Sequence, residues 1–145
     1  MQLKAIHILL VEDNEGDILL TREAFEDAKV HILLSVVRDG KAAVTFLNDA
    51  WSSAEPDLPD IILLDVNLPK MNGHEVLKYI KTSEPFRHIP VVMLTTTSHE
   101  KDVYEAYHHY VNSYITKPVE ISDFLSVVTS MEHFWLTIVK LPSTH

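Results

Sequence analysis

Five polar side chains of this sequence stand directly after short apolar runs, and their types suit chemistry at a common site. They are three acids, a hydroxyl and an amine: Glu12, Asp13, Asp65, Thr95 and Lys117. A carboxylate can act as a nucleophile or a metal ligand, and an ammonium can neutralise charge that develops on oxygen. These residues form a site only if the fold brings the ends of their apolar runs together.

The apolar runs have the length and composition of buried β-strands. Five of them are predicted, at residues 6–11, 32–37, 61–64, 91–94 and 113–116. Between and after them, apolar residues spaced by three or four predict amphipathic helices around residues 20–28, 43–47, 76–80, 103–110 and 121–138. This alternation predicts an α/β fold with a doubly wound parallel sheet. Ligands bind at the carboxyl ends of the strands in such a sheet, so the polar residues should meet at one edge.

Turn residues agree with this pattern. "RDG", ending at Gly40, and "NG", ending at Gly73, predict helix starts, and "HIP" before residue 91 predicts a strand start. Residues 52–59, "SSAEPDLP", predict a longer exposed loop. A non-catalytic alternative for Glu12 and Asp13 is a solvated turn in which Asp17 caps the next helix.

Composition narrows the class of protein. The 145 residues are expected to form one domain, 1–145, and the absence of cysteine excludes disulfides and thiolate metal sites. A formal net charge of -9 without a basic cluster argues against nucleic acid as a partner. No apolar run is long enough to span a membrane, and no signal-peptide pattern is visible. We therefore expect a cytoplasmic protein that neither binds nucleic acid nor enters a membrane.

The clustered acids at the predicted edge need positive charge. Two carboxylates about 4 Å apart repel each other by several kcal/mol at an effective dielectric constant near 20. Lys117 supplies one positive charge, and a divalent cation would supply two. Mg²⁺ suits such a site, because it needs one or two carboxylates and keeps several waters, whereas Ca²⁺ prefers a fuller cage of oxygens.

Four motifs together resemble the receiver domain of two-component response regulators. They are "LLVEDN", "ILLDVNLPKMNG", "MLTT" and "YITKP", and the resemblance covers about residues 6–131. It implies a flavodoxin-like five-stranded parallel sheet of strand order 2-1-3-4-5. It also implies a signalling domain that accepts a phosphoryl group, with only limited self-phosphorylation and self-dephosphorylation, rather than an enzyme. Glu12 stands where Asp is commoner in that family, which leaves its contact with the metal to be checked.

The resemblance also assigns roles to individual residues. Asp65 would be the phosphoacceptor, with Lys117 and Thr95 contacting the phosphoryl group. Mg²⁺ would be held by Asp13, Asp65, the backbone carbonyl of Asn67 and, through water, Glu12. Thr95 and Tyr114 would form the conformational switch, the Lys117–Pro118 bond would be cis, and Thr97 and Asn67 would tune dephosphorylation.

A narrower resemblance links the chain to the small single-domain regulators that partner phytochrome-type histidine kinases. It rests on the long loop before the third strand and on the tail "FWLTIVKLP". The expected partners are a sensor histidine kinase and a downstream protein target. An extended C-terminal helix and tail, about 132–145, would leave apolar surface for a homodimer to cover.

Other functions use parts of the same pattern. A metal-dependent aspartyl-phosphate phosphatase needs a second acid and a threonine after the nucleophile, where this chain has Asn67 and Pro69. A flavodoxin-like cofactor protein needs a first loop that cradles phosphate, and "EDNEGD" would repel it. A calcium loop would need glycine at Ile18. A phosphorylation-independent adaptor with the receiver fold stays possible, and the nine histidines, which show no ligand spacing, are expected on the surface.

Overall fold

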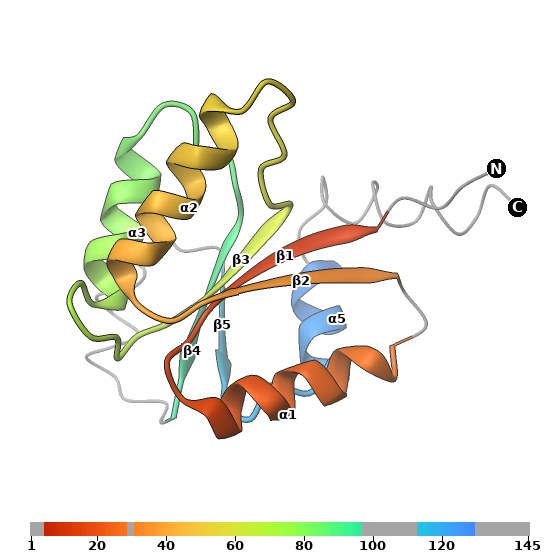
Figure 1. Ribbon diagram of the computed structural model, residues 1–145. Coiled ribbons are helices and arrows are strands. Elements are labelled where there is room, and N and C mark those ends of the chain that lie inside the picture. Colours follow the sequence, from red (N-terminus) through yellow and green to blue (C-terminus); the bar gives the residue numbers. More distant parts are fainter. Residues whose placement is uncertain (1–4, 29–30, 97–112, 130–145) are drawn as a thin grey trace, which may run out of the picture.

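The fold is a five-stranded sheet in which every pairing between neighbours is parallel (Figure 1). The computed structural model describes residues 5–28, 31–96 and 113–129. The strands are β1 (Ile6–Val11), β2 (Ile32–Val37), β3 (Ile61–Asp65), β4 (Val91–Thr95) and β5 (Ser113–Thr116), and their order is β2-β1-β3-β4-β5. The predicted fold class and strand order are confirmed. The third and fourth strands each extend one residue further than predicted and include Asp65 and Thr95.

Helices cover both faces of the sheet, and each face has its own apolar core. Helices α2 (Gly40–Ser52) and α3 (Gly73–Thr82) lie on one face, and α1 (Glu15–Glu26) and α5 (Ile121–Thr129) lie on the other (Figure 1). Side chains alternate along β1, so Leu9 packs under α2 and α3 while Ile8 packs under α1 and α5. The sheet is therefore buried on both sides, as continuous apolar strands require. The helix predicted at 103–110 and the C-terminal extension lie outside the described residues.

Three helices begin at a polar cap directly after a strand or its following loop. The side chains of Asn14, Asp39 and Asn72 accept hydrogen bonds from backbone N–H groups in the first turns of α1, α2 and α3. The helix starts predicted from "RDG" and "NG" are confirmed. The alternative in which Asp17 caps the first helix is wrong, because Asn14 Oδ1 accepts from the Asp17 N–H at 2.9 Å. The Asp17 side chain is therefore left for another role.

The first helix presents a different face to the core from the one predicted. It buries Ile18, Thr21 and Phe25, whereas Leu20, expected in the core, is 46% exposed. The inward stripe of the helix thus includes a polar residue, Thr21. The apolar spacing that includes Leu20 predicted the helix but not the face that it buries.

One histidine is internal, contrary to the expectation of surface histidines. His7 lies in the central strand β1 and is 7% exposed. Its Nε2 lies 2.8 Å from Ser35 Oγ, and its Nδ1 lies 3.6 Å from Asp57 Oδ1 in the predicted 52–59 loop. The loop therefore packs back over the amino end of β1 at this point.

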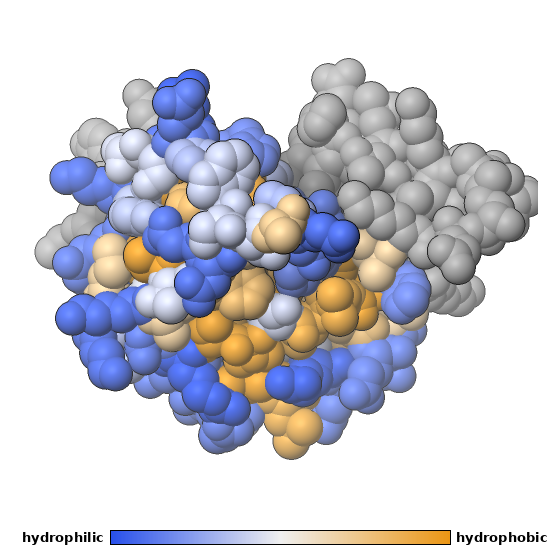
Figure 2. Space-filling view, turned by 45° about the horizontal axis from the view of Figure 1, so that its top comes forward, coloured by the Kyte–Doolittle hydropathy of each residue, from blue (hydrophilic) through white to orange (hydrophobic). Residues whose placement is uncertain are grey.

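The strand β2 forms one edge of the sheet and is less buried than the central strands. Leu33 on this strand is 52% exposed. Figure 2 shows hydrophobic side chains gathered in the middle of one face of the molecule, with hydrophilic ones around them. Among the described residues, no helix has the length and apolar character needed to cross a membrane.

Candidate functional site

The polar residues singled out in the sequence meet at the carboxyl edge of the sheet. Glu12 and Asp13 follow β1, Asp65 ends β3 and Thr95 ends β4. Lys117 follows β5, and its backbone N–H donates to the carbonyl of Thr95 at 2.7 Å. The parallel register that aligns β1, β3, β4 and β5 brings these strand ends together, so the predicted assembly is confirmed at the level of geometry.

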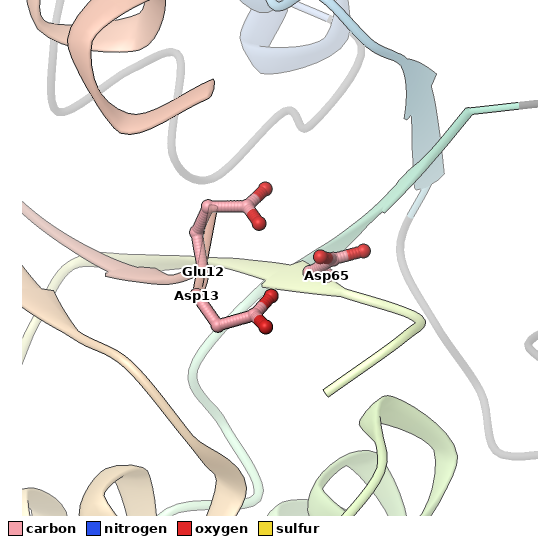
Figure 3. Close-up of side chains that lie close together, drawn as sticks. All are labelled: Glu12, Asp13 and Asp65. Atoms are coloured by element: carbon pink, nitrogen blue, oxygen red, sulfur yellow. The ribbon is translucent and has the colours of Figure 1, made fainter. Parts of the chain in front are cut away.

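Three acids form a compact group of oxygen atoms. Glu12, Asp13 and Asp65 each offer a carboxylate oxygen, and these atoms all lie within 4.8 Å of one another (Figure 3). Glu12 and Asp65 are buried, at 1% and 3% exposure, whereas Asp13 is exposed. Hard oxygen donors with one side open to water are the ligands that Mg²⁺ and similar divalent cations prefer. The residues therefore fit a divalent cation, with Asp13 on the open side.

The Lys117 ammonium is held by three carboxylates. Its Nζ lies 2.8 Å from Glu12 Oε1, 2.9 Å from Asp17 Oδ2 and 3.2 Å from Asp65 Oδ2. The Lys117 side chain is 9% exposed, so these contacts replace most of its water. Asp17 was not among the predicted site residues. The available signal for a site role was that Asp17 lies in the first turn of α1, four residues after Asp13. From the sequence, Asp17 is interpreted as a helix cap instead.

Burial and charge shift the protonation of this group of residues. Burial raises the pKa of Glu12 from 4.5 to about 7, although the hydrogen bond from Lys117 opposes the rise. Burial alone would lower the pKa of Lys117, but its hydrogen bonds with Glu12 and Asp17 and the nearby Asp65 charge raise it above its usual value. Lys117 is therefore always an ammonium near neutral pH, whereas Glu12 is poised to gain or lose a proton.

The Glu12 shift gives stability a defined pH dependence in the metal-free protein. Folded Glu12, with a pKa of about 7, holds a proton that the unfolded chain, at 4.5, has already released. Its stabilising contribution is thus complete below pH 4.5 and is lost as the pH rises through 7. We expect the free energy of unfolding in EDTA, measured by urea titration, to fall across this range. Glu12→Gln should flatten the fall, and an equally steep dependence in both proteins would contradict the assignment.

The loop after β3 packs tightly around Asp65. The Asn67 N–H donates to Asp65 Oδ1 at 3.2 Å, and the Gly73 N–H donates to the Val66 carbonyl at 3.0 Å. Lys70 adopts a left-handed conformation, with φ of 68°, which turns the chain toward α3. A Cβ atom at Gly73 would lie 2.3 Å from the Asp65 carbonyl oxygen. Glycine is therefore required where the loop returns beside the acid.

The residues of the predicted switch lie near the site. Thr95 is 4% exposed at the end of β4, and Tyr114 on β5 is half-buried against the core beneath α2 and α3. The Lys117–Pro118 bond is cis, which confirms that expectation. Thr97 lies outside the described residues. Thr95 thus lies at the sheet edge that carries the acids, and Tyr114 lies on the neighbouring strand, opposite Met93.

Fold and site together define a response regulator receiver. The family model for the response regulator receiver domain matches residues 8–129. This chain therefore belongs to the response regulator receiver family, whose members are proteins of two-component signalling that bind a divalent metal.

Its relatives include regulators linked to phytochromes. Response regulator Rcp1 of Synechocystis sp. is 42% identical over 136 residues, covering 94% of this chain and 92% of that protein. A Mn²⁺-bound structure of Rcp1 is similar, with a TM-score of 0.71 and 42% identity over 90% of this chain and 94% of that one. The phosphorylated cyanobacterial phytochrome response regulator RcpA has a TM-score of 0.74 and 42% identity, covering 92% of this chain and 95% of that one.

Proposed function

We propose that this protein is a stand-alone response regulator that accepts a phosphoryl group from a histidine kinase on Asp65. The observation that carries the proposal is the buried Asp65 carboxylate, which shares one edge of the sheet with two further acids and contacts the Lys117 ammonium at 3.2 Å. Membership of the receiver family supports phosphorylation on an aspartate. The phosphorylated RcpA structure supports it through a relative.

In the proposed reaction, an Asp65 oxygen attacks the phosphorus of a kinase phosphohistidine. An O–P bond forms as the P–N bond breaks, and the leaving imidazole recovers its proton from water. Mg²⁺ would be held by Asp13, Asp65 and the Asn67 carbonyl, with Glu12 acting through water. When bound, this ion supplies positive charge to the phosphoryl oxygens. Lys117 would supply further positive charge.

The proposed output is a change of protein-binding surface. The Thr95 hydroxyl would donate to a phosphoryl oxygen, and Tyr114 would turn inward as Thr95 moves. Each charge-assisted hydrogen bond is worth about 1.5–3 kcal/mol, and reversing a two-state equilibrium from 1:99 to 99:1 takes about 5.5 kcal/mol. Two new contacts at the upper end of this range, or three near its middle, would therefore be enough. In this proposal Asn67 and Thr97 tune how fast the phosphoryl group is lost.

The proposed upstream partner is a phytochrome-type histidine kinase. This part of the proposal is supported by the similarity to RcpA, a cyanobacterial phytochrome response regulator. The downstream target is a protein that recognises the switched surface. The cytoplasmic location expected from the sequence stays a prediction. Phosphotransfer profiles against several histidine kinases would identify the cognate one, as the kinase that transfers fastest.

The proposed assembly state is a homodimer. It rests on the apolar sequence of residues 132–145, which lie outside the described residues. We expect light scattering at micromolar concentration to give the mass of two chains, and a chain truncated after residue 131 to give the mass of one. A monomeric mass for the full chain, both with and without a phosphoryl analogue, would contradict the dimer.

Two alternatives make different predictions about the site. An adaptor that keeps only the fold would bind its target equally well with and without phosphate. A phosphatase would release phosphate continuously from small phosphate esters. Asn67, two positions after Asp65, carries an amide. It cannot serve as the general acid or base that the phosphatase alternative needs at this position. The receiver proposal alone predicts stoichiometric uptake of one phosphoryl group.

The decisive experiment is uptake of beryllofluoride, a phosphoryl analogue, followed by ¹⁹F NMR with and without Mg²⁺. A bound signal that needs Mg²⁺ supports the proposal, and no bound signal contradicts it. The fluorescence of Trp51, the tryptophan among the described residues, is a poorer readout of uptake. Trp51 lies near the end of α2, about 17 Å along the helix from Gly40 at the helix start near the site.

A further inference from the structure

Asp17 is the acid at this site for which neither the resemblance nor the proposed reaction has a role. Its Oδ2 lies 2.9 Å from Lys117 Nζ, almost as close as the Glu12 oxygen at 2.8 Å. The backbone around it is fixed at two points: its N–H donates to Asn14 Oδ1 at 2.9 Å, and its carbonyl accepts from the Thr21 hydroxyl at 2.8 Å. The contact with Lys117 is thus made by a side chain on a well-anchored helical turn.

The ammonium of lysine has three N–H donors, and all three have carboxylate partners here. A phosphoryl group on Asp65 would need at least one of these donors. The contact with Asp65 is remade when that residue carries the phosphoryl group, and Glu12 faces the proposed metal position. The contact with Asp17 lies on the α1 side and serves neither the metal nor the nucleophile, so it withholds positive charge from the reaction.

The net charge of the site also indicates that Asp17 opposes the reaction. Three carboxylates contact the Lys117 ammonium and Asp13 lies close to two of them, so the group carries three net negative charges when all four acids are ionised. An incoming phosphoryl donor is itself an anion, so each surplus carboxylate raises the free energy of its approach. Asp17 is the surplus acid, since the other three take part in metal binding or in the reaction.

We propose that Asp17 is a positioning residue that competes with the phosphoryl group for the Lys117 ammonium and so restrains phosphorylation of Asp65. This inference rests on the proposed function. The restraint is electrostatic: Asp17 holds the ammonium toward α1 and adds negative charge near the acceptor. Asp17→Asn keeps the size of the side chain, removes the negative charge and so weakens the hold on the ammonium. The variant is therefore expected to gain reactivity rather than lose it.

The chain offers a matched control in the same helical turn. Glu15 also lies in the first turn of α1, but its carboxylate is paired with Arg38 rather than Lys117. Glu15→Gln removes the same charge from the same turn and leaves the Lys117 contacts in place. A general effect of lowering the negative charge would appear in both variants, whereas the proposed effect appears only in Asp17→Asn.

The first test uses metal-free protein and needs no phosphorylation. Lysines are acetylated with a water-soluble ester, and the rate at Lys117 is followed by mass spectrometry of its peptide. Loss of one of its three carboxylate partners makes the Lys117 amine easier to deprotonate and to acetylate. We therefore expect Asp17→Asn to react about fivefold faster, which is the scale for one partly screened charge at close range. Glu15→Gln should match the unchanged protein. Equal rates in all three would overturn the claim that Asp17 holds Lys117.

The second test measures beryllofluoride uptake by ¹⁹F NMR at saturating Mg²⁺. We expect Asp17→Asn to reach half-saturation at about threefold to tenfold lower beryllofluoride, while its Mg²⁺ affinity falls, because one negative charge is gone. A purely structural role for Asp17 would weaken both. Weaker or unchanged uptake in Asp17→Asn, with normal uptake in the unchanged protein, would overturn this inference alone. Absence of uptake in the unchanged protein would overturn the proposed function instead.

Discussion

Asp65→Asn is expected to take up no phosphoryl group from acetyl phosphate and Mg²⁺, whereas the unchanged protein should gain the mass of one. This is the largest effect that the proposed function predicts. The amide is a much weaker nucleophile than the carboxylate. It is also uncharged, so it is a weaker ligand for the proposed metal ion. Intact-protein mass spectrometry measures the result directly, because one added phosphoryl group separates the two species.

Asp60→Asn is the matched control for that experiment. Asp60 directly precedes β3, so it stands at the opposite end of the strand that carries Asp65. There its Oδ2 accepts a hydrogen bond from the backbone N–H of His7 at 2.8 Å. We expect this variant to gain phosphate like the unchanged protein. Phosphate on Asp65→Asn, or equal loss in both variants, would show that the acceptor has been assigned to the wrong residue.

Gly73→Ala is expected to lower the free energy of unfolding by about 1–3 kcal/mol, the usual range for overpacking a well-packed site. The added Cβ would lie 2.3 Å from the Asp65 carbonyl oxygen and 2.8 Å from Val66 Cα. Both are backbone atoms of the strand end, so neither can turn aside as a side chain could. Urea denaturation measures the loss, and slower phosphate uptake should accompany it because Asp65 must shift.

Gly16→Ala is the control for the glycine at position 73. Gly16 lies in the first turn of α1, and a Cβ there would meet only Asn14 Oδ1, at 3.2 Å, among the described residues. Alanine favours a helix over glycine, which offsets the close contact. The free energy of unfolding should therefore change by less than about 0.5 kcal/mol. A loss as large as that of Gly73→Ala would mean that the backbone contact is not the cause.

Most of the fold could be predicted because its signals are local. The apolar runs that became β1 and β3 are buried on both faces, so they needed no tertiary information to be recognised. The meeting of Glu12, Asp65 and Lys117 followed from one rule of parallel sheets, that ligands bind at the carboxyl ends of the strands. The individual roles of these residues came from the resemblance, and they are still proposals.

What the sequence did not reveal depends on contacts between distant residues. Asp17 bonds to a lysine 100 positions later, and no local pattern marks that pairing. His7 is internal because β1 is a central strand. From the sequence, the histidines are expected on the surface because they show no ligand spacing. Leu20 belongs to the apolar spacing that predicted the first helix, but the helix buries Ile18 and Phe25 and leaves Leu20 46% exposed.

The Lys117–Glu12 contact joins residues 105 positions apart. During synthesis, Glu12 leaves the ribosome long before its partner, so a nascent chain that ends before residue 117 has the acids of the site but not the cation that balances them. Contacts of such sequence separation form late, because the entropy of closing a long loop opposes them. Capacity to take up phosphate should consequently emerge only after residue 117 has left the ribosome, and chains that end before this residue should take up none.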